Sequence, residues 1–148
     1  MERIIGLLHE GGYSCVVRNG ERIRTFGRRG VADLHELLHR EPELLEGASV
    51  ADKVVGKAAA ALMAAGGVRE LYADTVSEGA LELLRRAGIE VSFGRRVPHI
   101  VNRTRTDICP LERRCLAARE VAECLSAIDE FVAAGRASRP ADAAAGRS

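Results

Sequence analysis

Residues 107–115 carry the strongest chemical signal of the chain, reading Asp-Ile-Cys-Pro-Leu-Glu-Arg-Arg-Cys. Proline has no amide hydrogen and favours the first position of a helix, which predicts Cys109 as the N-cap and Glu112 as the third helical residue. Free helix amides and the two neighbouring arginines stabilise a thiolate there, so we predict Cys109 as the most acidic thiol. Such a thiol could serve as a nucleophile, a redox sensor or a metal ligand. An inert capping thiol, with Glu112 closing the cap, is an equally good interpretation.

The other three cysteines are predicted to be core residues. Cys115 and Cys124 fall on apolar arcs of the same C-terminal helix, and Cys15 lies on an apolar strand. Cys109 and Cys115 could hold zinc only with a loop donor such as His99, and five residues between two cysteines is unusual zinc spacing. We therefore predict no metal site and no cofactor.

Two arginine-rich segments could bind an anion. Arg28 and Arg29 stand between glycines before a predicted helix, where backbone amides and guanidinium groups suit a phosphate or a carboxylate. A solvated turn is the alternative interpretation of this first segment. The second segment, residues 94–106, directly precedes the cysteine motif. The predicted ligand-binding residues are Arg28, Arg29, Arg96, His99, Asn102 and Arg103.

Lys57 stands between Gly56 and a run of alanines, where close packing of a helix could leave its amine facing a pocket. With Cys109 and Glu112 it completes the candidate catalytic set. Lys53, one turn earlier on the same predicted helix, is expected to be solvated. No role is assigned to the histidines of ordinary amphipathic helices, namely His9, His35 and His39.

The composition suits one domain of 148 residues, with 47% hydrophobic residues, 3% aromatic residues and a net charge of +1. The scarcity of aromatic residues leaves few stacking platforms for nucleic acid, and the near-zero charge provides no global field. No signal peptide or membrane span is evident, and reduced cysteines suit the cytoplasm. We expect a cytoplasmic protein whose partner is a small anionic or nucleotide-like molecule, without nucleic acid or membrane. Homo-oligomer formation stays open.

The elements that must position these residues begin with an amphipathic helix over residues 2–10. Strands over 13–18 and 21–26 flank Asn19-Gly20, the signal for a type I′ turn, and this turn pairs Val16 with Ile23, Cys15 with Arg24 and Val17 with Arg22. A helix follows over 31–39 and stops near Pro42. Ser49 to Asp52 has capping-box spacing, which predicts a central helix from Ser49 to Gly66.

The second half of the chain predicts a strand over 68–73, a helix from Thr75 to Gly88 and a strand over 89–93, which together form a parallel crossover. Residues 97–101 could add a short edge strand. A final helix is predicted over 110–134, followed by a disordered tail over 135–148. This order predicts an α/β fold, a three-layer α/β/α domain over residues 1–134 with a mixed sheet.

The element order, Gly56-Lys-Ala-Ala-Ala60 and Cys109-Pro-Leu-Glu112 together resemble a small prokaryotic family, domain of unknown function 1893, over roughly residues 2–125. The resemblance implies a cytidine-deaminase-like fold. In deaminases, a His or Cys followed by Ala and Glu on the central helix supplies a zinc ligand and the proton-transferring carboxylate, and Pro-Cys-x-x-Cys supplies two further ligands.

The chain departs from that zinc pattern in both motifs. Residues 56–59 read Gly-Lys-Ala-Ala, without a ligand or a carboxylate, and proline follows the first cysteine of the later motif. The resemblance therefore implies a deaminase-like domain without zinc-dependent deamination, whose cleft is lined by Lys57, Cys109 and Glu112. We expect it to bind a small anionic or nucleotide-like ligand, with catalysis through Cys109 unproven. The alternatives are a thiol redox or sulfur-handling enzyme, a zinc-binding regulatory module, and a non-catalytic partner-binding domain.

Overall fold

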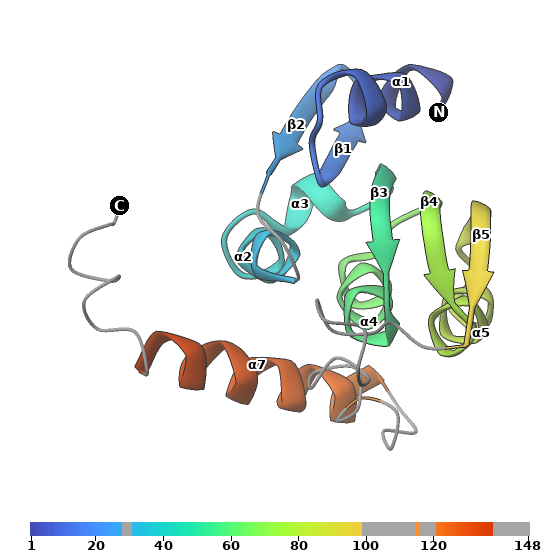
Figure 1. The fold of residues 1–148 in the computed structure, drawn as a ribbon. Helices are drawn as coiled ribbons and strands as arrows, with labels where there is room; N and C mark the ends of the chain where they lie inside the picture. Colours follow the sequence, from blue (N-terminus) through green and yellow to red (C-terminus); the bar gives the residue numbers. More distant parts are fainter. Residues whose placement is uncertain (28–30, 99–114, 116–120, 138–148) are drawn as a thin grey trace.

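The computed structural model describes residues 1–27, 31–98, 115 and 121–137 (Figure 1). The elements in chain order are α1 (Glu2–Glu10), β1 (Cys15–Asn19), β2 (Arg22–Phe26), α2 (Ala32–Arg40), α3 (Pro42–Leu45), β3 (Ser49–Val55), α4 (Lys57–Gly66), β4 (Glu70–Ser77), α5 (Glu78–Arg86), β5 (Glu90–Val97) and α7 (Val121–Ala137).

The five described strands form one mixed sheet in the order β2-β1-β3-β4-β5. β3, β4 and β5 run parallel, whereas β1 is antiparallel to both of its neighbours. On one face of the sheet, α1 buries Ile4 and Leu8 against Val16 and Ala51. The large core on the other face includes buried residues of α2, α3, α4, α5 and α7. The predicted α/β fold with a mixed sheet between helices is therefore confirmed.

The predicted central helix is wrong in its first half, because residues 49–55 form β3, the middle strand of the sheet. The apparent capping box and the apolar stripe around Val54 and Val55 suggested helical periodicity. The apolar residues of β3 come as Val50 and Ala51, then Val54 and Val55, and this spacing of three and four residues matches a helix as well as a strand. Lys53 consequently lies on a strand, and the helix begins only at Lys57.

The second half of that prediction is confirmed by α4, which is the central helix of the domain. Its residues 58–63 are all buried, and it packs against α2, α3, α5 and α7. The small alanine side chains permit this close approach on several sides. Gly66 ends the helix directly against Leu45 of α3, where a Cβ atom would lie 2.9 Å from the Leu45 side chain.

The hairpin forms as predicted, but its register is shifted by two residues. Val16 pairs with Thr25, and the loop consists of Gly20 and Glu21 instead of Asn19 and Gly20. The left-handed residue is Gly20, at φ +63°. A shift of two leaves every side chain on the predicted face, so the hydrophobic pattern alone cannot distinguish the two registers.

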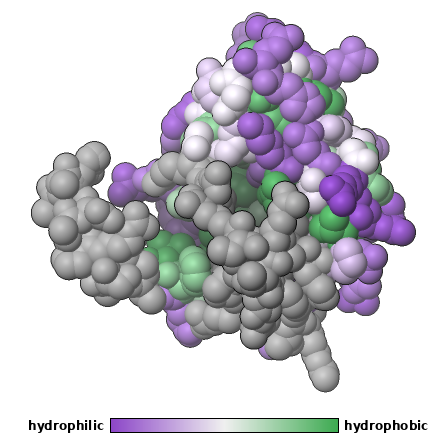
Figure 2. All heavy atoms as spheres, viewed as in Figure 1, coloured by the Kyte–Doolittle hydropathy of each residue, from purple (hydrophilic) through white to green (hydrophobic). Residues whose placement is uncertain are grey.

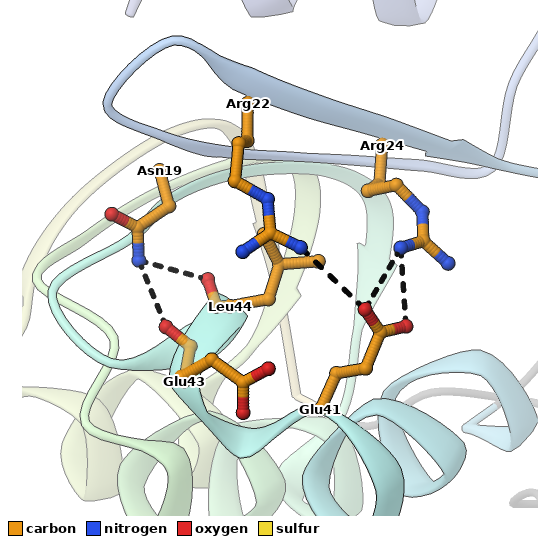
Figure 3. A network of polar contacts seen from close by, with 6 residues as sticks. All are labelled: Asn19, Arg22, Arg24, Glu41, Glu43 and Leu44. Atoms are coloured by element: carbon orange, nitrogen blue, oxygen red, sulfur yellow. Dashed lines mark hydrogen bonds and ion pairs between the residues drawn. The ribbon is translucent and has the colours of Figure 1, made fainter.

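Contacts with α3 and with the residue before it account for the observed register (Figure 3). The side-chain amide of Asn19 donates to the carbonyl oxygens of Glu43, Leu44 and Glu46, at 3.2, 3.1 and 2.7 Å. Arg24 binds both carboxylate oxygens of Glu41 at 3.1 Å, and Arg22 lies 3.6 Å from the same carboxylate. Asn19 thus closes the end of a helix and stays in the strand.

The parallel crossover is confirmed, although its strands are longer than predicted. β4 continues to Ser77, whose hydroxyl accepts the Ala80 amide at 3.2 Å and caps α5, so the predicted start at Thr75 is wrong. β5 continues to Val97, while residues 99–101 of the proposed edge strand lie outside the described residues. Extended pairing with the neighbouring strand satisfies the backbone groups of these extra residues.

The last described helix, α7, packs along α4 and continues to Ala137, three residues into the predicted tail. No described helix has the length and apolarity needed to span a membrane. Figure 2 shows a predominantly hydrophilic surface over the upper part of the view, where α1 and the hairpin lie. Among the described residues, two large hydrophobic side chains are nevertheless exposed: Val54 at 49% and Phe131 at 40%.

Candidate functional site

The carboxyl ends of β3, β4 and β5 define one edge of the sheet, and two helices begin there. α4 starts directly after β3 with Gly56 as its N-cap, and α5 starts directly after β4 with Ser77 as its N-cap. Each helix start presents backbone amides and the positive end of a dipole. Ligands of open α/β sheets bind in the crevice outside the carboxyl ends of the strands. This edge is therefore the candidate functional site.

Lys57 connects the two helix starts. It is the first residue of α4, and its Cδ atom lies 3.7 Å from the position that a Cβ atom would occupy at Gly79 in the first turn of α5. Its backbone carbonyl also lies 3.9 Å from Sγ of Cys124 on α7. A cation at a helix N-terminus is repelled by the positive end of the helix dipole, and here the N-termini of α4 and α5 both lie near the Lys57 side chain. The combined positive potential favours an anion at this position.

Asp52 and Cys15 form a second feature of the same edge, because they are directly paired between β3 and β1. The Cys15 thiol donates to the Asp52 carboxylate, which also accepts the Val54 amide at 3.3 Å. Desolvation raises the pKa of Asp52 to about 7 and outweighs these hydrogen bonds, which lower the pKa. Perturbed carboxylates of this kind occur both at functional sites and in structural networks.

The Cys15 thiol itself is buried and has a pKa well above its usual value. Desolvation is the main cause, followed by the negative charges of Asp52 and of Asp33 on α2. A thiol with a raised pKa is neutral at physiological pH and is a poor nucleophile. Cys115 and Cys124 are also buried, which confirms the prediction of three core cysteines.

Two of the predicted site residues lie within the described structure. Lys57 lies at the carboxyl edge, as above, and Arg96 is exposed on β5, paired with Val76 one residue before the strand ends. The others lie outside the described residues, namely Arg28, Arg29, His99, Asn102, Arg103, Cys109 and Glu112. Phe26 of β2 and Val97 of β5 end at the same edge, and the two sequence segments that hold these residues come directly after these strands in the chain.

Within the described part of the chain, cavities also lie away from this edge. One of 390 Å³ lies between α3 and the C-terminal end of α4, beside Glu43, Glu46 and Gly66. A second, of 230 Å³, is lined by Arg24 and Phe26 of the hairpin and by Glu36 and Arg40 of α2. The second is bordered by the ion pairs of Arg24 with Glu41 and of Arg40 with Glu36, and neither cavity contains a residue of the candidate set.

A cluster that the sequence analysis missed lies between α2 and α7. His35 Nε2 is 2.9 Å from Asp129 Oδ1 and 3.1 Å from His39 Nε2. These three atoms have the identity and proximity of a metal-binding group. Residues 35–39 read His-Glu-Leu-Leu-His, which has the His-Glu-x-x-His spacing of zinc helices, and this signal was available in the sequence. The prediction of no role for His35 and His39 overlooked it.

A second missed cluster holds α1 to the opposite face of the sheet. His9 Nε2 lies 2.7 Å from Asp74 Oδ1, and the Tyr72 hydroxyl donates to the same oxygen at 2.8 Å. The hydrogen bond to Asp74 raises the pKa of Tyr72. Nothing in the local sequence reveals this cluster, because α1 and β4 meet only in the folded domain.

Comparison with known proteins places the chain in a family. Residues 3–132 match the sequence model of a domain of unknown function, DUF1893. A crystal structure of a DUF1893 family protein from Thermotoga maritima superposes with a TM-score of 0.81, at 25% sequence identity and with 88% of each chain covered. No curated protein matches. Because the match spans most of the sequence, the chain belongs to the DUF1893 family.

Proposed function

We propose that this chain binds a small anionic, nucleotide-like ligand at the carboxyl edge of β3 and β4, and that its fold is cytidine-deaminase-like. The observation that carries the proposal is the position of Lys57, whose backbone begins α4 while its side chain extends to the start of α5. The deaminase resemblance aligns this segment with the zinc-ligand position of the central helix. In this chain, that segment contains Lys57, which provides a positive charge instead of a metal ligand.

The surroundings of Lys57 support a ligand with both charged and apolar parts. Amides at the starts of α4 and α5 are suited to a phosphate or a carboxylate. Val54, at the end of β3, is 49% exposed and provides an apolar surface nearby. Of the arginines predicted to bind the ligand, Arg96 lies on β5, and the others follow β2 or β5 in the sequence; both strands end at this edge. A negatively charged group with an attached ring or aliphatic part would use both kinds of surface.

Ligand binding is tested by screening inorganic phosphate and nucleoside mono-, di- and triphosphates for an increase in Tm, followed by calorimetric titration. A charge-assisted contact contributes about 1.5–3 kcal/mol, so Lys57→Ala should weaken binding of the best probe by roughly 10- to 100-fold. Lys53→Ala is the matched control, because Lys53 lies on β3 before the helix start. Equal affinities of the two variants, or no binding by any probe, would refute the proposal.

The catalytic part of the proposal assigns a reactive thiol to Cys109. The buried state of Cys15, Cys115 and Cys124 supports ligand binding over thiol exchange, since none of these three is an accessible partner thiol. Native protein treated with iodoacetamide should therefore be labelled first at Cys109, and Cys109→Ser should abolish the rapid phase. Following the labelling rate against pH measures activation: an apparent pKa near ~8.5 would mean an ordinary thiol and would remove catalysis from the proposal.

A further inference from the structure

Three potential metal ligands converge on one point between α2 and α7. His35 Nε2 lies 2.9 Å from Asp129 Oδ1, His39 Nε2 lies 3.1 Å from His35 Nε2, and His39 Nε2 lies 3.6 Å from Asp129 Oδ1. The two histidines are four residues apart on α2, so their rings project from the same helix face. The carboxylate comes from a helix 94 residues away from His35 in sequence.

Without a metal ion, the single ring hydrogen of His35 Nε2 must serve two short contacts, one to Asp129 and one to His39. If His35 Nε2 carries its proton toward Asp129, it has no lone pair to accept a proton from His39. If His39 donates to His35 instead, the His35 lone pair faces the Asp129 carboxylate. In the first tautomer the His35 N–H can be shared between the Asp129 carboxylate and the His39 lone pair, which weakens each bond, and in the second tautomer the contact with Asp129 is repulsive. A metal ion accepts lone pairs from all three atoms at once and removes this conflict.

The spacing of the three atoms also fits a tetrahedral ion. Ligands at about 2.0–2.1 Å from a tetrahedral zinc ion lie about 3.3–3.4 Å from one another. The three observed separations, 2.9, 3.1 and 3.6 Å, bracket this value. An ion above the triangle would need only shifts of a few tenths of an ångström from each side chain.

Burial holds part of the site in place and leaves one side open. The His35 side chain is 11% exposed, whereas those of His39 and Asp129 are 55% and 58% exposed. Ile128, next to Asp129, is fully buried and anchors this turn of α7 in the core. The exposed side leaves a fourth coordination position for water or for a ligand atom.

We propose that His35, His39 and Asp129 bind a divalent transition-metal ion, with zinc as the best representative, which joins α2 to α7. Two imidazoles and a carboxylate favour zinc, nickel, cobalt or copper over magnesium or calcium. The ion replaces the shared hydrogen of His35 and crosslinks two helices that are distant in sequence. Glu36 receives no part, because it pairs with Arg40 at 3.9 Å beside the 230 Å³ cavity. The site is independent of the carboxyl edge.

The test uses full-length protein carrying Cys109→Ser, so that a thiolate at that position does not compete, after removal of metal with a chelator. Titration with Zn²⁺ against a chromogenic chelator should reveal one site, and binding should raise the Tm. Co²⁺ should give the visible absorption of a tetrahedral nitrogen–oxygen site. His39→Ala and Asp129→Asn, both at exposed positions, should each weaken zinc binding at least 10-fold.

His9→Ala is the matched control, because His9 is also a helical histidine facing an aspartate, Asp74, and it should leave zinc affinity unchanged. Lys57→Ala should also leave it unchanged, which separates this site from the proposed ligand site. Circular dichroism confirms that the variants are folded. Failure of zinc to bind folded protein, or equal affinity of His39→Ala and His9→Ala, would mean that the three side chains form interhelical hydrogen bonds only.

Discussion

Replacing Asp52 by Asn should make the protein more stable at neutral pH and leave it nearly unchanged in acid. The oxygen of the Asn side chain can still accept the Val54 amide and the Cys15 thiol, so the hydrogen bonds of the folded state are largely kept. What the substitution removes is a carboxylate that desolvation makes costly to ionise. Asp52 is a suitable position because it lies inside the sheet, paired with Cys15.

The size and the sign of the effect follow from the pKa of Asp52 in the two states. In the unfolded chain an aspartate has a pKa near ~3.9, whereas in the folded protein the pKa of Asp52 is about 7. Between these values the unfolded state ionises first, so the free energy of unfolding falls as pH rises and levels off above pH 7. Three pH units at about 1.36 kcal/mol each would give about 4 kcal/mol. Asp52 is only partly buried, so water screens its charge, and we expect about 2–4 kcal/mol.

The assay is urea unfolding of the wild type and of Asp52→Asn at pH 4 and pH 8, followed by circular dichroism. The difference in unfolding free energy between the two proteins should grow by about 2–4 kcal/mol from pH 4 to pH 8, because only the wild type carries this carboxylate. Glu90→Gln, which changes an exposed carboxylate at the start of β5, should differ from the wild type by less than about 0.5 kcal/mol. The reasoning is refuted if the advantage of Asp52→Asn is the same at both pH values.

Two further substitutions test packing and the register of the hairpin. Gly66→Ala should lower the unfolding free energy by about 1–3 kcal/mol, because the added Cβ would lie 2.9 Å from the buried Leu45 side chain. Gly6→Ala, with no atom within 4 Å of the added Cβ, should raise the unfolding free energy by about 0.5–1 kcal/mol. Both are measured by urea unfolding, and equal effects of the two substitutions would contradict the packing at Leu45. Asn19→Asp keeps the side-chain size but faces carbonyl oxygens without a donor, so it should destabilise by about 1–3 kcal/mol, and a variant as stable as wild type would argue against the observed register.

Local sequence patterns were sufficient to predict an element when its pattern of buried and exposed residues is the same along its whole length. α1 was predicted correctly over residues 2–10, because its apolar residues repeat at helical spacing and two glycines follow it. The burial of Cys15, Cys115 and Cys124 also followed from their apolar neighbours in sequence. The β3–α4 boundary did not, since Ser49–Val55 satisfies a helix-start pattern and is a strand only because β1 and β4 pair with it.

Some residues of the candidate site could likewise be identified from the sequence, and others only from the tertiary structure. Lys57 was identified from its neighbours, Gly56 and the alanines, and the structure adds that its side chain reaches the start of α5. Asp52 was not identified, because its raised pKa depends on β1 lying beside β3 and on the partial desolvation that this pairing causes. The spacing of His35 and His39 was readable from the sequence, but Asp129 meets them only through the packing of the C-terminal helix.

The sequence by itself determined the class of the fold, its family membership and the residue types available for chemistry, because periodicity, turn residues and short motifs act over a few neighbouring positions. The tertiary structure decided the register of the hairpin, the start of the central helix, the ionisation of Asp52 and the convergence of His35, His39 and Asp129. Each of these depends on contacts between segments far apart in the chain, where pairing, desolvation and distance are set by the packed domain as a whole.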